Sequence, residues 1–145
     1  MAEGYTSTAG RILARASREA RLLGHTTTDT GHLVLSIAAE HSTPAAAVLR
    51  DLGVTEPALR AAARKYRPAR AAVPRGRPVF TWRLRRVLRR AVELGPDRIG
   101  PEHLLLALVQ EDRGTGARAL ASVGASAARV RTATRRLVAG DGAAD

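Results

Sequence analysis

The chain contains no cysteine and very few aromatic residues. Among its 145 residues there are one tryptophan, one phenylalanine and two tyrosines, so aromatics make up 3%. Without cysteine there is neither a disulfide framework nor a thiolate metal site. A core with so few rings must be built mainly from alanine, leucine and valine, and this composition favours closely packed helices over a sheet.

Long hydrophobic runs are also missing. No stretch approaches the roughly 18 apolar residues of a membrane span, and the first ten residues have neither a basic segment nor an apolar run of the kind found in signal peptides. From this we expect a cytoplasmic protein. Since hydrophobic residues still make up 45% of the chain, the composition is that of a folded domain and not of a disordered one.

Acidic residues are outnumbered by basic ones, which gives a formal net charge of +11. Such a charge attracts nucleic acid, anionic membranes and acidic proteins. Lys65 is the single lysine, so the basic residues are almost all arginine. Heavy use of arginine and alanine also follows from a GC-rich coding bias, and the charge by itself therefore identifies no partner.

An internal repeat is the strongest pattern in the sequence. Shifting the chain by 71 residues superposes equivalent residues without a gap, including a Gly-x7-His-Leu-x-Leu frame and a second glycine. The matched pairs are Leu13 with Leu84, Ala20 with Ala91, Gly24 with Gly95, His32 with His103, Leu33 with Leu104, Leu49 with Leu120 and Gly53 with Gly124. A repeat of this kind indicates one supersecondary unit used twice.

Each repeat is predicted to form four helices, giving an all-α domain of two pseudo-symmetric four-helix repeats. Repeat one covers about 5–65, a proline-rich linker 66–79, repeat two about 80–137, and a disordered tail 138–145. Gly24 and Gly95 are predicted C-caps. Thr30 is the predicted N-cap of a central helix from Gly31 to about Glu40. The helices predicted for repeat two are Trp82–Leu94, Pro101–Gln110, Gly116–Val123 and about Ser126–Leu137.

The repeated motifs resemble those of the Clp N-terminal domain of Hsp100 unfoldases, especially the ClpC type. Repeat two contains Phe80-Thr81, Leu94-Gly95 and the run Ile99-Gly100-Pro101-Glu102-His103-Leu104. Repeat one contains the more divergent Tyr5-Thr6, Leu23-Gly24-His25 and Thr30-Gly31-His32-Leu33. No Gly-x4-Gly-Lys-Ser/Thr loop is present, so the ATPase motif is missing. The resemblance implies a stand-alone binding module of the Clp system: an adaptor, a decoy, or a protein that sequesters a cyclic peptide antibiotic directed at the unfoldase.

The same resemblance points to a pocket at the start of the second helix of each repeat. Some ClpC-type domains bind phosphoarginine there, with a glutamate as partner of the guanidinium. Glu102 matches that glutamate and is followed by His103, whereas Gly31 stands at the equivalent position of repeat one, and Pro101 replaces a threonine. The alternative is that Glu102 only stabilises the N-terminus of its helix through the helix dipole.

A second candidate is a groove between the repeats. In the family, an aromatic residue at each repeat start lines a patch that binds peptides, including cyclic peptide antibiotics. Tyr5 and Phe80 match those starts, and Leu13 and Arg85 fall on the helices that follow. Alternatively, the two aromatics are hydrophobic staples that hold the beginnings of these helices.

No catalytic constellation, cofactor motif or metal-ligand spacing is found in the sequence. His32 and His103 lie among apolar residues and are interpreted as satisfied core histidines. The run of arginines around Trp82 (Arg83, Arg85, Arg86, Arg89 and Arg90) is either a solvated basic face or a nucleic-acid patch. The latter gives the alternative function, a basic nucleic-acid-binding regulator. We therefore expect a non-enzymatic module that binds a peptide or protein segment, with no metal.

Overall fold

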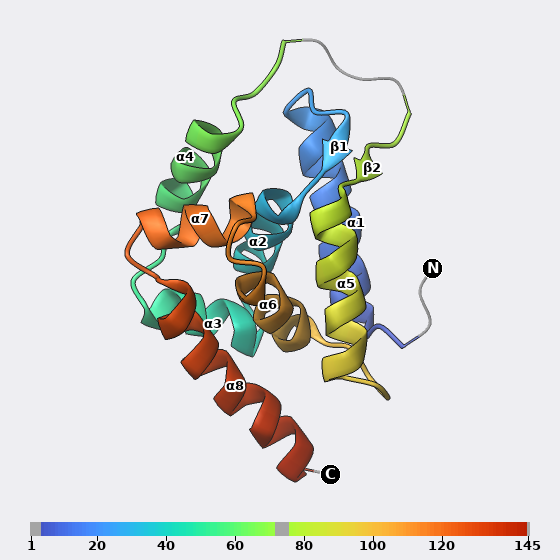
Figure 1. The fold of residues 1–145 in the computed structure, drawn as a ribbon, viewed down its shortest axis with the longest axis vertical. Helices are drawn as coiled ribbons and strands as arrows, with labels where there is room; N and C mark the ends of the chain where they lie inside the picture. The colour runs from blue at the N-terminus through green and yellow to red at the C-terminus, as the bar shows by residue number, and fades with distance from the viewer. Residues whose placement is uncertain (1–3, 72–75, 145) are drawn as a thin grey trace.

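The computed structural model describes residues 4–71 and 76–144 and is all-helical apart from two short strands (Figure 1). In chain order the elements are α1 (Ser7–Leu22), β1 (Thr27–Thr28), α2 (Thr30–Ala39), α3 (Pro44–Asp51), α4 (Glu56–Tyr66), β2 (Val79–Phe80), α5 (Trp82–Leu94), α6 (Pro101–Gln110), α7 (Thr115–Ser122) and α8 (Ala127–Ala144). Each repeat supplies four helices, which confirms the predicted fold class. Residues 72–75 of the predicted linker lie outside the described residues.

The two repeats are joined by short parallel pairings that cross between them. β1 of repeat one pairs with β2, which leads into α5 of repeat two, in the register Thr28 to Phe80. In the same way Tyr5, just before α1, bridges to Ile99, just before α6. Each repeat therefore begins beside the second helix of the other repeat. Nothing in the sequence predicted these pairings, because two-residue strands leave no alternation to detect.

The core is centred on α2 and α6, which lie in the middle of the molecule (Figure 1). Nearly every residue of both helices is buried, and the matching residues Leu33 and Leu104 have no exposed surface. A helix that is apolar on all faces must be surrounded by other helices. The predicted central position of the helix from Gly31 is confirmed, and α6 takes the same position in repeat two.

The matching glycines Gly24 and Gly95 end their helices in different ways. Gly24 has φ +75°, and its neighbours make the two hydrogen bonds of a Schellman motif, from Gly24 N to Arg21 O and from His25 N to Ala20 O. Gly95 has φ −129° and does not use the left-handed region. A Cβ at Gly95 would lie 2.6 Å from the Arg98 carbonyl oxygen and 2.8 Å from the His103 ring. Gly95 is thus needed for close packing against His103, not for backbone conformation.

Two further expectations are corrected. The N-cap of α2 is Asp29 and not Thr30, because the Asp29 carboxylate accepts the N–H groups of Gly31 and His32. α8 continues past Leu137 into the tail that we expected to be disordered from residue 138. Leu137 and Val138 pack against the core, and this contact carries the helix beyond the predicted boundary.

Candidate functional site

An open pocket of about 620 Å³ lies at the N-terminus of α6. The first residues of α1, the loop before α3, the segment 94–98 after α5 and Val138 of α8 form its other walls, so three helix beginnings meet around it. The Tyr5–Ile99 bridge explains the arrangement, since it places the start of α1 beside the start of α6. Polar side chains supply much of the lining: Thr6, Thr8, Ser42, Thr43, Asp97, Arg98, Glu102 and His103.

Glu102 supplies a carboxylate to this pocket. Its side chain makes no hydrogen bond or ion pair with any other residue that the structure describes. The carboxylate lies against Gly100, where an added Cβ would come within 2.3 Å of Oε1. A glycine at position 100 therefore makes room for this carboxylate at the mouth of the helix, where it is available to a cationic ligand.

His103 is a buried structural residue of the same pocket. Its side chain is 8% exposed, and Nδ1 accepts the backbone N–H of Gly100 at 2.9 Å. Burial lowers the pKa of His103, so the neutral ring is favoured, with its proton on Nε2. His103 orients the turn that precedes α6, as the interpretation of a satisfied core histidine predicted.

The equivalent place in repeat one is closed. At the N-terminus of α2 the cavity holds only about 10 Å³. A Cβ on Gly31 would lie 2.9 Å from the Thr115 side chain, because Thr30 Oγ1 accepts the N–H of Gly116 and holds α7 against this helix end. A glutamate like Glu102 does not fit there. This packing accounts for the missing carboxylate of repeat one.

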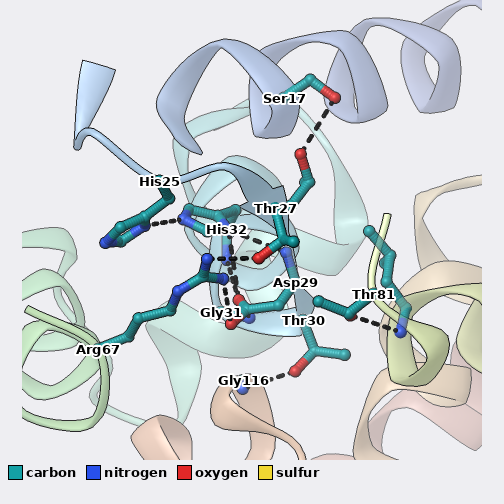
Figure 2. Close-up of polar contacts among 12 residues, drawn as sticks. Ser17, His25, Thr27, Asp29, Thr30, Gly31, His32, Arg67, Thr81 and Gly116 are labelled. Atoms are coloured by element: carbon teal, nitrogen blue, oxygen red, sulfur yellow. Dashed lines mark hydrogen bonds and ion pairs between the residues drawn. The ribbon is translucent and has the colours of Figure 1, made fainter. Parts of the chain in front are cut away.

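Buried polar groups fill the closed site (Figure 2). Arg67, from the end of α4, bonds to Asp29 Oδ2 at 2.9 Å and to Thr27 Oγ1. His25 and His32 are in contact, 2.8 Å between Nδ1 and Nε2. Burial on its own would raise the pKa of Asp29, yet the contacts with His32 and Arg67 together hold that pKa well below its usual range. Sequence reasoning missed this network, because no local pattern links residues 38 positions apart.

The lowered pKa values of His25, His103 and Asp29 predict that acid lowers the stability of the fold. Burial lowers the pKa of His25 and of His103 below the ordinary value of 6.5, so the unfolded chain binds more protons just below that pH. The contribution of the two neutral histidines to the stability is complete above pH 6.5 and is lost as the pH falls below 6.5 towards their lowered pKa values. Asp29 adds a further loss below its ordinary pKa of 3.8. We expect Tm to fall between pH 7.5 and 5, measured by circular dichroism.

A variant without the two histidines of lowered pKa tests the assignment of this slope. The double variant with His25→Gln and His103→Gln should show a flatter dependence of Tm on pH over the same range, because neither glutamine titrates. His41→Gln is the matched control, since the His41 side chain is 70% exposed. An equally flat profile in the His41 variant would show that the buried rings do not carry the effect.

The structure does not bring the predicted groove residues together. Phe80 pairs with Thr28 beside Ser17, whereas Tyr5 lies before the first turn of α1. These places are about 16 Å apart along α1 at 1.5 Å per residue. Tyr5 and Phe80 are each partly buried and packed on the core. Leu13 is a core residue, only 7% exposed, and lines no surface. Of the four, Arg85 alone is exposed.

The arginine run on α5 forms a local ion-pair network around Trp82. Arg83 and Arg86 both approach the carboxylate of Glu111, at 2.8 and 3.4 Å. The same two guanidinium groups lie 4.5 and 5.5 Å from the centre of the Trp82 ring. Arg83 therefore shares a face with Arg86. These contacts favour a solvated structural face over a nucleic-acid patch.

The described part of the chain offers neither a metal site nor a membrane-spanning helix. It holds no group of three or more histidine, aspartate or glutamate side chains placed to bind a metal ion. Nor does any helix there combine the length and apolarity needed to cross a membrane.

Comparison with known proteins identifies what the chain resembles. The sequence profile of the Clp repeat (R) N-terminal domain matches residues 4–98 and 91–140. Chaperone protein ClpC1, chloroplastic, of Oryza sativa subsp. japonica is 35% identical over 142 residues, which cover 95% of this chain and 16% of that protein. Chaperone protein ClpC, chloroplastic, of Pisum sativum is 34% identical, with 95% and 15% covered. The chain thus spans about a sixth of these relatives.

Solved structures show the same fold. The N-terminal domain of the caseinolytic protease associated chaperone ClpD from Arabidopsis thaliana has a TM-score of 0.76 and 27% identity, over 93% of this chain and 95% of that one. The Hsp104 N-terminal domain from Candida albicans has a TM-score of 0.75 over 93% and 91% of the two chains. Its identity of 15% makes it evidence for the fold alone.

Proposed function

The chain belongs to the family of Clp repeat N-terminal domains, and from this premise we propose that it is a non-catalytic binding module that takes protein segments destined for the Clp protease system. In the Hsp100 chaperones this domain generally binds substrates and adaptors. The proposal includes a cytoplasmic location and the absence of enzymatic activity in this chain. It also covers roles as adaptor, decoy or antibiotic-sequestering protein, which differ only in what is bound.

The open pocket at α6 is the observation that carries the proposal. Glu102 offers an unpaired carboxylate, and the same pocket contains the exposed Arg98 and the N-termini of α6 and α1. A carboxylate suits a guanidinium, while arginine and helix N-termini suit a phosphate. A side chain carrying both groups, phosphoarginine, matches this combination. Pro101 has no backbone N–H, so the N-terminus of α6 offers one N–H donor fewer to a phosphate than a helix without this proline.

Calorimetric titration with a phosphoarginine-containing peptide tests the pocket. We expect binding that Glu102→Gln weakens by about 10- to 100-fold, since a charge-assisted hydrogen bond contributes about 1.5–3 kcal/mol. Glu93→Gln, on the exposed face of α5, is the matched control and should bind like the wild type. Equal affinity of the Glu102 and Glu93 variants would leave the carboxylate with the structural role at the helix N-terminus only.

A second titration, with a cyclic peptide that targets ClpC, separates the antibiotic-sequestering variant from the others. Tight binding that is lost in Phe80→Ala would support the antibiotic-sequestering role, whereas the absence of any heat of binding would exclude this role.

The nucleic-acid alternative rests on the net charge alone, because Glu111 and Glu93 pair with three of the α5 arginines. Steeply salt-dependent DNA binding would be needed to revive it.

A further inference from the structure

The Arg67 guanidinium is held in repeat one as a ligand is held in a binding site. One terminal nitrogen bonds to Asp29 Oδ2 at 2.9 Å and the other to Thr27 Oγ1. Arg67 is 25% exposed and Asp29 13%, so the pair lies at the mouth of a nearly filled cavity (Figure 2). A guanidinium can donate from two nitrogens in one plane to a carboxylate and a hydroxyl at the same time, whereas an ammonium has a single nitrogen and cannot make this contact.

The receiving carboxylate of Asp29 is fixed independently of Arg67. Asp29 Oδ1 accepts the N–H groups of Gly31 and His32, which leaves Oδ2 for the guanidinium. The backbone N–H of Asp29 donates to His32 Nδ1 at 2.9 Å, which leaves His32 Nε2 to carry a ring proton. That proton is donated to His25 Nδ1, and His25 Nε2–H donates to the Pro68 carbonyl at 2.8 Å. The chain of bonds leads from the helix N-terminus back to the residue after Arg67.

The segment Arg67–Arg70 therefore lies across the site as a strap. It is attached by the Arg67 side chain, by the Pro68 carbonyl and by the bond from Arg70 N to Leu23 O at 2.7 Å. The site that it covers, the N-terminus of α2, is the repeat-one equivalent of the open pocket at α6. In the open pocket the carboxylate belongs to Glu102 and is unpaired, whereas in repeat one it belongs to Asp29 and is occupied.

We propose that repeat one contains a guanidinium-binding site whose occupant is the chain's own Arg67, and that the strap closes this site to arginine side chains of other proteins. An external guanidinium binds there only when Arg67 is removed or displaced. The proposal concerns Asp29, Thr27 and Arg67 alone and does not depend on what binds at Glu102.

Chemical rescue tests the site. In the full chain, Arg67→Ala should lower Tm, and about 20 mM n-propylguanidine at pH 7.5 should raise the Tm of this variant by roughly 2–3 °C more than that of the wild type. Arg64→Ala is the matched control, because Arg64 lines the same small cavity without bonding to Asp29 or Thr27. Adding Asp29→Asn to Arg67→Ala should abolish the rescue. An equal rise in the Arg64 variant, or no rise in the Arg67 variant, would overturn the proposal.

A second measurement does not require the alanine variant to fold. In the wild-type chain, a guanidinium held by Asp29 and Thr27 should give separately resolved Nη proton resonances, assigned by their loss in Arg67→Lys. Asp29→Asn should merge them into the averaged signal of free arginines. A single averaged Arg67 signal in the wild type would show that the side chain rotates freely and occupies no site.

Discussion

Truncation of Leu104 to alanine is expected to lower the free energy of unfolding by about 3 kcal/mol, within the range of about 2–5 kcal/mol for buried leucines. Leu104 has no exposed surface and lies on α6, which the other helices surround. Such a position leaves a cavity that the neighbours cannot easily fill. Because a domain of this size is stable by only about 5–15 kcal/mol, the change removes a large share of its stability.

Urea denaturation followed by circular dichroism measures this loss. Leu33→Ala, at the matching position of α2, should cost a similar amount, because Leu33 is equally buried. Leu22→Ala is the control of identical chemistry, and since Leu22 is 72% exposed it should change the free energy of unfolding by less than about 0.5 kcal/mol. Similar losses at Leu22 and Leu104 would contradict the placement of α6 at the centre.

The helices could be predicted from sequence because their signals are local. The bounds expected for α5 and α6, Trp82–Leu94 and Pro101–Gln110, are those observed. Pro101 marks the first position of α6, and the apolar run behind it identifies a buried helix. The repeat then transfers the same assignment to α2. Local periodicity and a motif found twice are enough to define the all-α fold and the family.

Only part of the candidate site could be predicted from such local signals. The motif located Glu102 and His103 at a helix beginning, but the pocket also needs Thr6 from α1 and Thr43 before α3, which tertiary packing alone brings there. The relative positions of the proposed groove residues could not be predicted, because the chain crosses between the repeats, so that Tyr5 and Phe80 pair at different places. Pairings of two residues leave no trace in hydrophobic periodicity.

The asymmetry of the two repeats illustrates the same limit. The sequence shows that Gly31 stands where repeat two has Glu102, and this suggested a pocket that had lost its carboxylate. In the structure a carboxylate is present two residues earlier, at Asp29, and it is used internally by Arg67. Since Arg67 lies in a proline-rich stretch that read as a linker, only the folded chain shows that it completes repeat one.

Replacement of Asp29 by alanine is expected to cost about 3 kcal/mol, because three interactions end together. The N-cap bonds to Gly31 and His32 contribute about 1 kcal/mol. The remainder comes from Arg67, which is left without its carboxylate; the figure of about 3–5 kcal/mol for broken buried pairs is an upper limit here, since Arg67 is 25% exposed. Urea denaturation at pH 7.5 measures the change.

Two further variants divide this cost between cap and ion pair. Asp29→Asn keeps a good N-cap residue and removes the charge, so it should cost less than alanine, about 1–2 kcal/mol. Asp112→Ala, an exposed aspartate without an ion pair among the described residues, should stay within about 0.5 kcal/mol of the wild type. In a double-mutant cycle, Asp29→Asn should add little to Arg67→Ala, because either change already breaks the same contact. Fully additive losses would mean that the two side chains stabilise the fold separately, and that Arg67 is not the partner that keeps Asp29 ionised.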